Sequence, residues 1–322
     1  MALFPLKLIP AETRIDFMRW RFVTVIVMAA LMLVSIALIA TRGFNYALDF
    51  TGGTSVELLF EQPADVDEVR ERLEAAGYPG AQVQTMGTGS ALMIRLQPKD
   101  GATDDAEAIN RTADDVLRAA STEANPATIK GRSFVGPQVG QDLAKKGVYA
   151  IVFVVLGFLI YIAFRFEWKF AVSAIVTTLG DMLIVAGWFS LAGREFDLTL
   201  LAGLLTVMGF SINDTIVVFD RVRENFRGMR ASPLEVLNTS INQTLSRTII
   251  TSVVAFLTVV ALYVYGGGSL AGMSEAMMIG IVIGTASSIL VACPLLSFGV
   301  LRVTKQDLLP KARDEEALAR RP

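Results

Sequence analysis

The chain has 322 residues, of which 53% are hydrophobic and 19% are charged, and its mean hydropathy is +0.52. Soluble domains are about a quarter charged, so this composition indicates a membrane protein. The formal net charge of −2 offers no basic surface for nucleic acid. The chain has no histidine and one cysteine, which excludes Ser-His-Asp triads, His-ligated zinc or haem, and an internal disulfide. We expect no cofactor, no metal and no enzymatic activity.

Six long apolar runs predict six transmembrane helices, because about 20 helical residues cross a hydrocarbon core of about 30 Å. The sequence places these spans at residues 22–40, 148–164, 170–191, 198–219, 248–265 and 276–300. The first apolar run is long for a signal peptide, and its end lacks the small residue that a cleavage site needs at the −3 position. We therefore expect it to remain as a span.

Basic residues indicate the orientation of the chain. The segments 1–21, 165–169, 220–247 and 301–322 lie on one side of the predicted membrane and contain most of the 29 Lys and Arg residues. The two short loops on the other side contain Arg194 alone. The positive-inside rule then places both termini, including the 301–322 tail, in the cytoplasm. The 41–147 segment lies outside.

The outside segment has the pattern of a small α+β domain. Alternating apolar residues and turn signals predict strands at 54–60, 82–86, 92–96 and 127–135, and helices at 65–76 and 103–122. Gly87, Thr88 and Gly89 separate the second and third strands, as in a hairpin. The order β-α-β-β-α-β is that of a ferredoxin-like domain.

A second helix signal lies on the cytoplasmic side, at residues 232–246. Ser232, Pro233 and Glu235 form a capping box with proline at the first helical position. The apolar residues that follow at helical spacing are Leu234, Leu237, Ile241 and Leu245. This pattern predicts a short amphipathic helix that lies on the membrane surface and leads into span five.

Two carboxylates lie inside predicted spans, Asp181 in span three and Asp214 in span four. A charge at the bilayer centre costs about 2.5–3.5 kcal/mol on insertion scales, and such residues usually mark ion pathways. Ser211, Asn213 and Thr215 give Asp214 polar neighbours. The alternative is that each Asp is fixed in a permanent hydrogen-bonded network between helices. Arg247, at the cytoplasmic start of span five, is the natural cation for Asp214, or else a simple positive-inside anchor.

Several motifs occur in order along the chain. They include Asp49-Phe50-Thr51-Gly52-Gly53 after span one, Asn213-Asp214-Thr215 in span four, Ser246-Arg247-Thr248 at span five and Gly284-Thr285-Ala286-Ser287-Ser288 in span six. Together they closely resemble the SecD/SecF family, a branch of the resistance-nodulation-division transporter superfamily. The resemblance runs from about residue 16 to residue 300.

This resemblance implies a six-span subunit of the bacterial inner membrane, with the 41–147 domain in the periplasm. The family uses the proton-motive force to promote late steps of preprotein translocation. The resemblance also implies SecD and the SecYEG translocon as partners, with YajC, YidC, the translocating preprotein and membrane lipid as further contacts. Asp214 and Arg247 match the family residues implicated in proton coupling. Asp181 is a further candidate for the proton relay.

Two other functions fit the span count. The chain could be half of another proton-driven transporter of the superfamily, although the Asp-Phe-Thr-Gly-Gly motif argues against this. It could also be a scaffold that stabilises the translocon without transporting, in which case neutral substitutions of Asp214 would be harmless. An intramembrane hydrolase would need a nucleophile and base pair, and the sequence has no such pair.

Overall fold

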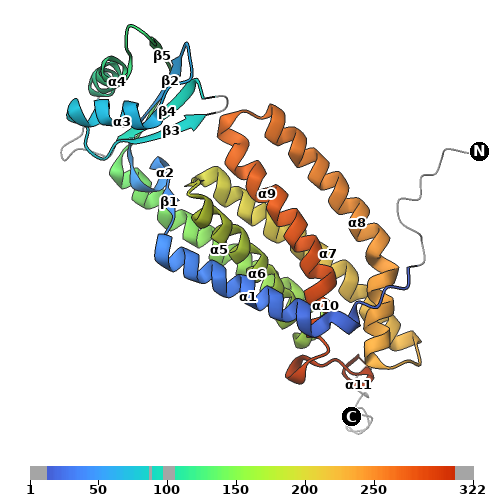
Figure 1. The fold of residues 1–322 in the computed structure, drawn as a ribbon. Coiled ribbons are helices and arrows are strands. Elements are labelled where there is room, and N and C mark those ends of the chain that lie inside the picture. Colours follow the sequence, from blue (N-terminus) through green and yellow to red (C-terminus); the bar gives the residue numbers. More distant parts are fainter. Residues whose placement is uncertain (1–12, 87–88, 97–105, 309–322) are drawn as a thin grey trace, which may run out of the picture.

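The computed structural model describes residues 13–86, 89–96 and 106–308. A bundle of long helices forms most of the molecule, and a small α+β domain lies at one end of it (Figure 1). The predicted hairpin residues Gly87 and Thr88, the acidic start of the predicted 103–122 helix, and most of both terminal segments lie outside the described residues. We call the two ends of the bundle the domain end and the opposite end.

Six helices of the described chain are long and apolar enough to cross a membrane, as the sequence predicted. They are α1 (Arg21–Arg42), α5 (Pro137–Arg165), α6 (Trp168–Ala192), α7 (Leu198–Gly228), α8 (Pro233–Tyr265) and α9 (Gly268–Ser287), whose span continues to Leu295. Most exceed their predicted spans because the flanking polar residues are helical too. Helices α6, α7 and α9 are the most buried, whereas α1 and α5 are more apolar and largely exposed. Exposed apolar helices are what lipid contact requires.

The last span is interrupted near the opposite end of the bundle. Helix α9 passes into a π-helical turn, η2 (Ser288–Ala292), and then into α10 (Cys293–Leu295), which contains Pro294. Proline lacks a backbone N–H and disturbs the regular ladder. In this interrupted segment the carbonyl of Ala292 accepts a buried hydrogen bond of 2.7 Å from the Ser173 hydroxyl of α6. Two short 3-10 helices, η1 (Met18–Trp20) and η3 (Gly299–Leu301), and the helix α11 (Lys305–Leu308) complete this end.

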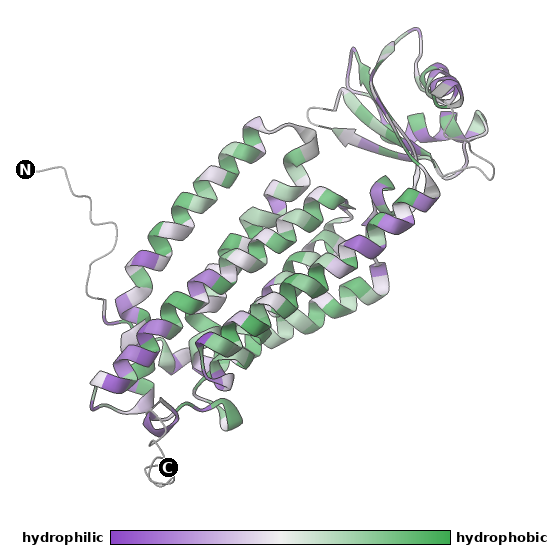
Figure 2. Ribbon diagram, turned by 180° about the vertical axis from the view of Figure 1, so that it is seen from behind, coloured by the Kyte–Doolittle hydropathy of each residue, from purple (hydrophilic) through white to green (hydrophobic). Residues whose placement is uncertain are grey.

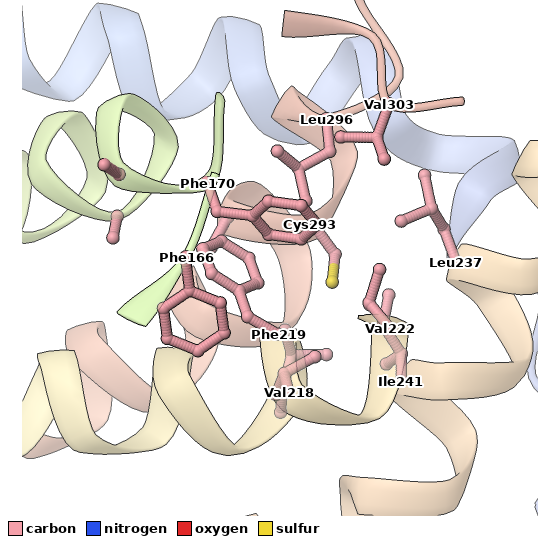
Figure 3. Packing of buried hydrophobic residues seen from close by; sticks show 14 of the residues in the cluster. Phe166, Phe170, Val218, Phe219, Val222, Leu237, Ile241, Cys293, Leu296 and Val303 are labelled. Carbon is pink, nitrogen blue, oxygen red and sulfur yellow. The ribbon is translucent and has the colours of Figure 1, made fainter. Parts of the chain in front are cut away.

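The structure corrects the prediction of a separate surface helix at 232–246. Helix α8 begins at Pro233, capped by the Ser232 side chain, and runs to Tyr265 without a break. Leu237 and Ile241 are buried in a protein core with Phe219, Val222 and Cys293, whereas Leu234 is exposed (Figure 3). The spacing predicted an apolar face correctly. The residues that cover that face come from distant segments of the chain. The sequence pattern alone could not show that the face is covered by protein and not by lipid.

The soluble domain, residues 53–135, contains a four-stranded antiparallel sheet in the order β3-β4-β2-β5. Its strands are β2 (Gly53–Phe60), β3 (Gln82–Met86), β4 (Ala91–Leu96) and β5 (Ala127–Val135). Helices α3 (Val66–Ala75) and α4 (Ala106–Ala120) pack on one face. Val56, Leu58, Leu92 and Ile94 alternate toward those helices and are fully buried. The Asp65 carboxylate caps α3.

Short elements connect the domain to the bundle. Strand β1 (Asn45–Tyr46), which follows α1, pairs in parallel with β6 (Glu195–Phe196), which lies between α6 and α7. The one-turn helix α2 (Leu48–Thr51) then leads into the sheet. Figure 2 shows the predominantly hydrophobic bundle, with hydrophilic residues concentrated at its opposite end and in the domain. The core of the bundle and the core of the domain are separate clusters.

Candidate functional site: two buried carboxylates in the bundle

Asp181 lies in the interior of the bundle, where α6, α7 and α9 meet. Its side chain is completely buried, and one carboxylate oxygen, Oδ2, accepts two hydrogen bonds. The donors are the hydroxyls of Ser211 on α7, at 2.5 Å, and Ser287 on α9, at 2.8 Å. The other oxygen, Oδ1, has no hydrogen-bond partner among the described residues. No cationic side chain compensates the carboxylate within this part of the structure.

A close contact between α7 and α9 makes this arrangement possible. A Cβ atom on Gly280 would lie 2.3 Å from Val207 Cγ2, and a Cβ atom on Gly284 would lie 3.1 Å from Ser211 Cβ. Glycine at these two positions lets the helix backbones approach, as small residues do in membrane bundles. The approach brings Ser211 and Ser287 to the same carboxylate.

Asp214 is three residues beyond Ser211 on α7, and it is 2% exposed. Its Oδ2 lies 3.4 Å from the hydroxyl of Ser252 on α8. That hydroxyl also lies 2.7 Å from the carbonyl of Thr248 and accepts a 2.7 Å hydrogen bond from Thr285 on α9. A serine hydroxyl has one proton to donate. The shorter bond to Thr248 therefore competes with Asp214, which is held weakly.

Three further buried hydroxyls lie beside the two carboxylates. The Oγ1 atoms of Thr178, Thr215 and Thr248 have no partner among the described residues. Thr178 is one turn before Asp181 on α6, and Thr215 is one turn beyond Ser211 on α7. Because α6 and α7 are antiparallel neighbours, both threonines lie on the same side of the Asp181–Ser211 contact. The region is consequently polar throughout, with oxygens available to accept or donate.

The structure does not bring Arg247 into contact with Asp214. Arg247 is exposed, and within the described residues it forms no ion pair. It precedes Ser252, the α8 neighbour of Asp214, by five residues, which corresponds to a rise of about 7.5 Å and a rotation of about 140°. The two residues therefore form no ion pair in this structure, although Arg247 is close enough to attract Asp214 electrostatically.

The three supporting residues near Asp214 have different environments. Ser211 and Thr215 are fully buried, and Ser211 serves Asp181 instead of Asp214. Asn213 is exposed on the outer surface of α7. Sequence reasoning gave no individual role to Ser252, Thr285 or Ser287, although the motif at 284–288 contains two of them. The signal available was a set of hydroxyls within apolar runs.

The Gly-Gly motif lies at the domain end. Gly52 and Gly53 both have positive φ angles, of +71° and +128°, a conformation that favours glycine. A Cβ atom on Gly53 would also lie 2.3 Å from the carbonyl oxygen of Leu96, and one on Gly140 would lie 2.9 Å from the Gly52 nitrogen. The motif thus allows α5, α2 and the end of β4 to meet closely.

The residues that precede the two glycines hold the start of α7. Asp49 Oδ2 accepts a 3.0 Å hydrogen bond from the backbone N–H of Leu198, the first residue of α7. The Phe50 ring lies 5.9 Å from the Phe196 ring, centroid to centroid. Thr51 donates its hydroxyl to the carbonyl of Ala47 at 3.2 Å. These five motif residues lie near the start of α7, at the domain end, whereas Asp181 and Asp214 lie deeper in the bundle. The motif therefore forms a structural joint between the domain and the bundle and is not part of the buried site.

Comparisons with known proteins place this arrangement in a family. The family model "Protein export membrane protein SecD/SecF, C-terminal" matches residues 116–301, and the "SecD/SecF GG Motif" model matches residues 37–64. The chain belongs to the SecD/SecF family. Within the described residues no cluster of His, Cys, Asp and Glu could hold a metal ion.

Named relatives cover nearly the whole chain. Protein translocase subunit SecF of Escherichia coli O157:H7 is 42% identical, over 89% of this chain and 88% of the relative. Protein translocase subunit SecDF of Brucella abortus is 40% identical over 92% of this chain, which spans 38% of that longer relative. The crystal structure of SecDF from Thermus thermophilus matches 90% of this chain with a TM-score of 0.81 and 36% identity. This chain spans 39% of that SecDF chain.

Proposed function

We propose that the chain is the SecF-type subunit of a proton-driven accessory complex of the Sec translocon, and that Asp214 carries the proton. The observation that supports this most directly is the pair of buried carboxylates, each bonded to hydroxyls and neither paired with a cation within the described residues. A carboxylate removed from water and from cations favours its neutral form, and a nearby cation favours the charged form. Asp214 can therefore change its protonation when its surroundings move.

The proposed relay couples Asp214 to Arg247 and Asp181. When α8 turns or slides against α7, Arg247 approaches Asp214 and stabilises the carboxylate; when the helices return, the carboxylate takes up a proton. The exposed position of Arg247 and the weak Ser252 contact support such a movement. Each proton that crosses about 150 mV makes about 3.5 kcal/mol available. This exceeds the few kcal/mol that separate typical conformers.

We infer that SecD is the partner and that it covers the exposed face of α7 and α8 that carries Asn213 and Arg247. Thr206 of α7 and Thr258 of α8 line one otherwise mostly apolar cavity of about 590 Å³. Asn213 and Arg247 lie about two and three turns away on those same helical faces. Polar side chains facing lipid are costly, so a protein partner fits this face. The SecDF relatives, in which a longer chain includes this part, support the assignment.

The remaining assignments are also proposals. The strand order β3-β4-β2-β5 supports a ferredoxin-like periplasmic domain within residues 41–147, where it could contact preprotein. The basic residues of the opposite end support cytoplasmic termini in the bacterial inner membrane. SecYEG, YajC, YidC, preprotein and membrane lipid are proposed contacts.

The test is preprotein export in inner-membrane vesicles, with and without a proton gradient. Asp214→Asn keeps the size of the side chain and removes its titration, so the complex should assemble while gradient-dependent export is lost. Asp220→Asn is the matched control, since this carboxylate lies at the exposed end of the same helix in an ion pair with Arg165. A complex of Asp214→Asn that retains full gradient dependence would show that Asp214 is structural, as in the scaffold alternative.

A further inference from the structure

One ion pair joins the soluble domain to the bundle within the part of the chain that the structure describes. Arg95, near the end of β4, pairs with Glu195 of β6. Arg95 points away from α3 and α4, because its neighbours Ile94 and Leu96 occupy the helix-covered core. The other ion pairs between described residues lie within the domain or within the bundle.

The pair is largely shielded from water. The Arg95 side chain is 10% exposed and the Glu195 side chain 19%. Burial lowers the pKa of Arg95 to about 10, partly offset by the attraction of Asp197 and Asp49. The guanidinium is still charged at neutral pH; it pairs directly with Glu195, and Asp197 and Asp49 attract it from further away. Removing one member of a buried pair leaves a charge uncompensated, so the contact is costly to open.

All three carboxylates are attached to the start of α7. Glu195 lies in the strand that precedes this helix. Asp197 caps its first turn by accepting the N–H of Leu200 at 2.6 Å, and Asp49 accepts the N–H of Leu198 at 3.0 Å. The same helix carries Asp214, further along the bundle. Arg95 thereby pairs with the strand that leads directly into the helix whose movement the proposed function requires.

We propose that Arg95 is a positioning residue that, through Glu195, fixes the soluble domain to the start of α7 and so transmits movement of that helix to the domain. The inference rests on the proposed function for its consequence in export, but the positioning itself does not depend on proton transfer. The parallel β1–β6 pair connects the same two regions through only two residues on each strand. The packing of α2 on α5 and the direct passage of β5 into α5 also hold the domain at the bundle, and the Arg95–Glu195 pair adds the side-chain contact to the segment that precedes α7.

The first test measures the angle without measuring activity. Spin labels on Arg111→Cys of α4 and Leu191→Cys of α6, both exposed, report the distance between domain and bundle when Cys293 is replaced by Ser. We expect one narrow distance distribution for the purified complex with Arg95 and Glu195 intact. Glu195→Gln should broaden it, whereas Lys130→Met should not. Lys130 pairs with Glu57 inside the domain and provides the control. An unchanged narrow distribution in Glu195→Gln overturns the proposal.

The second test measures export per proton taken up by vesicles. Arg95→Met and Glu195→Gln should each lower this ratio about 5- to 150-fold, the usual range of coupling between sites. The double variant should lose no more than either single variant, since the two residues act through one contact. A purely structural role would reduce proton uptake and export together. Ratios at the wild-type level, or losses that multiply in the double variant, overturn the proposal. Failure of the proposed function would instead appear in Asp214→Asn, with the spin-label result unchanged.

Discussion

Ser211 donates its hydroxyl to Asp181 across the α6–α7 contact, and on α7 it lies three residues, or nearly one turn, from Asp214. Movement of α7 that alters the environment of Asp214 must therefore also shift a hydrogen bond to Asp181. The two buried carboxylates are connected mechanically through this serine. The connection gives Asp181 a testable part in the relay.

Asp181→Asn should assemble with its partner and lose most gradient-dependent export. Asparagine has the size of aspartate and its oxygen still accepts a hydroxyl, but it cannot take up a proton. Ser287→Ala should have a milder effect, because Ser211 still donates to the carboxylate. Interhelical hydrogen bonds in membranes average about 0.6 kcal/mol, so its effect on thermal unfolding should be small. Export of Asp181→Asn at the wild-type level would make this residue a fixed structural polar group.

Gly280→Ala should destabilise the purified complex by about 1–3 kcal/mol, the usual cost of overpacking. The added methyl would meet the buried Val207 at 2.3 Å and push α9 from α7. Thermal unfolding in detergent measures the loss. Val207→Ala in the same chain removes the opposing methyl groups and should restore part of the stability. Gly157→Ala serves as the control, since nothing lies within 4 Å of its Cβ position. Equal stability of the two glycine variants would contradict the close α7–α9 contact.

Leu237→Ala should lower the free energy of unfolding by about 2–5 kcal/mol, as expected when a buried leucine is truncated. Leu237 is 1% exposed and packs in the core at the opposite end, on the first half of α8. Leu234→Ala, in the same helical segment but exposed, should change stability by no more than about 0.5 kcal/mol. If the two substitutions cost the same in a denaturation series, residues 233–246 are not packed against the protein.

The Lys169–Asp307 pair at the opposite end should contribute to stability at neutral pH and not in acid. Burial alone would raise the pKa of Asp307, but hydrogen bonds from Lys169 and Thr304 outweigh it, and the pKa is below its ordinary value. The contribution is therefore complete above the unfolded pKa of about 3.9, and it disappears as pH falls through the lower folded value.

Lys169→Met measures this contribution. Relative to the unchanged protein, it should lower stability by at most about 1 kcal/mol at pH 7; the difference should begin to fall below about pH 4 and vanish below the lower folded pKa of Asp307. Arg221→Met is the control, because that residue forms an exposed pair with Glu224 one turn away. A difference that persists unchanged in acid would show that the side chain of Lys169 acts through packing and not through charge.

The sequence by itself determined the six membrane helices and the strands and helices of the soluble domain, because hydrophobic length and periodicity are local properties. It also identified Asp181 and Asp214, since a carboxylate inside an apolar run is visible without any contact information. The Asp49 motif and the capping box at Ser232 were equally visible, as both depend on neighbouring residues.

Only the tertiary structure decided what these residues touch. It assigned Ser211 to Asp181, brought Ser252 and Thr285 beside Asp214, turned Arg247 outward, and buried Leu237 in protein. It also showed that Arg95 reaches Glu195, 100 positions away in sequence. Each of these contacts depends on the relative rotation and register of helices that are distant in the chain. Packing and glycine contacts such as Gly280 against Val207 set that register, and no local pattern encodes it.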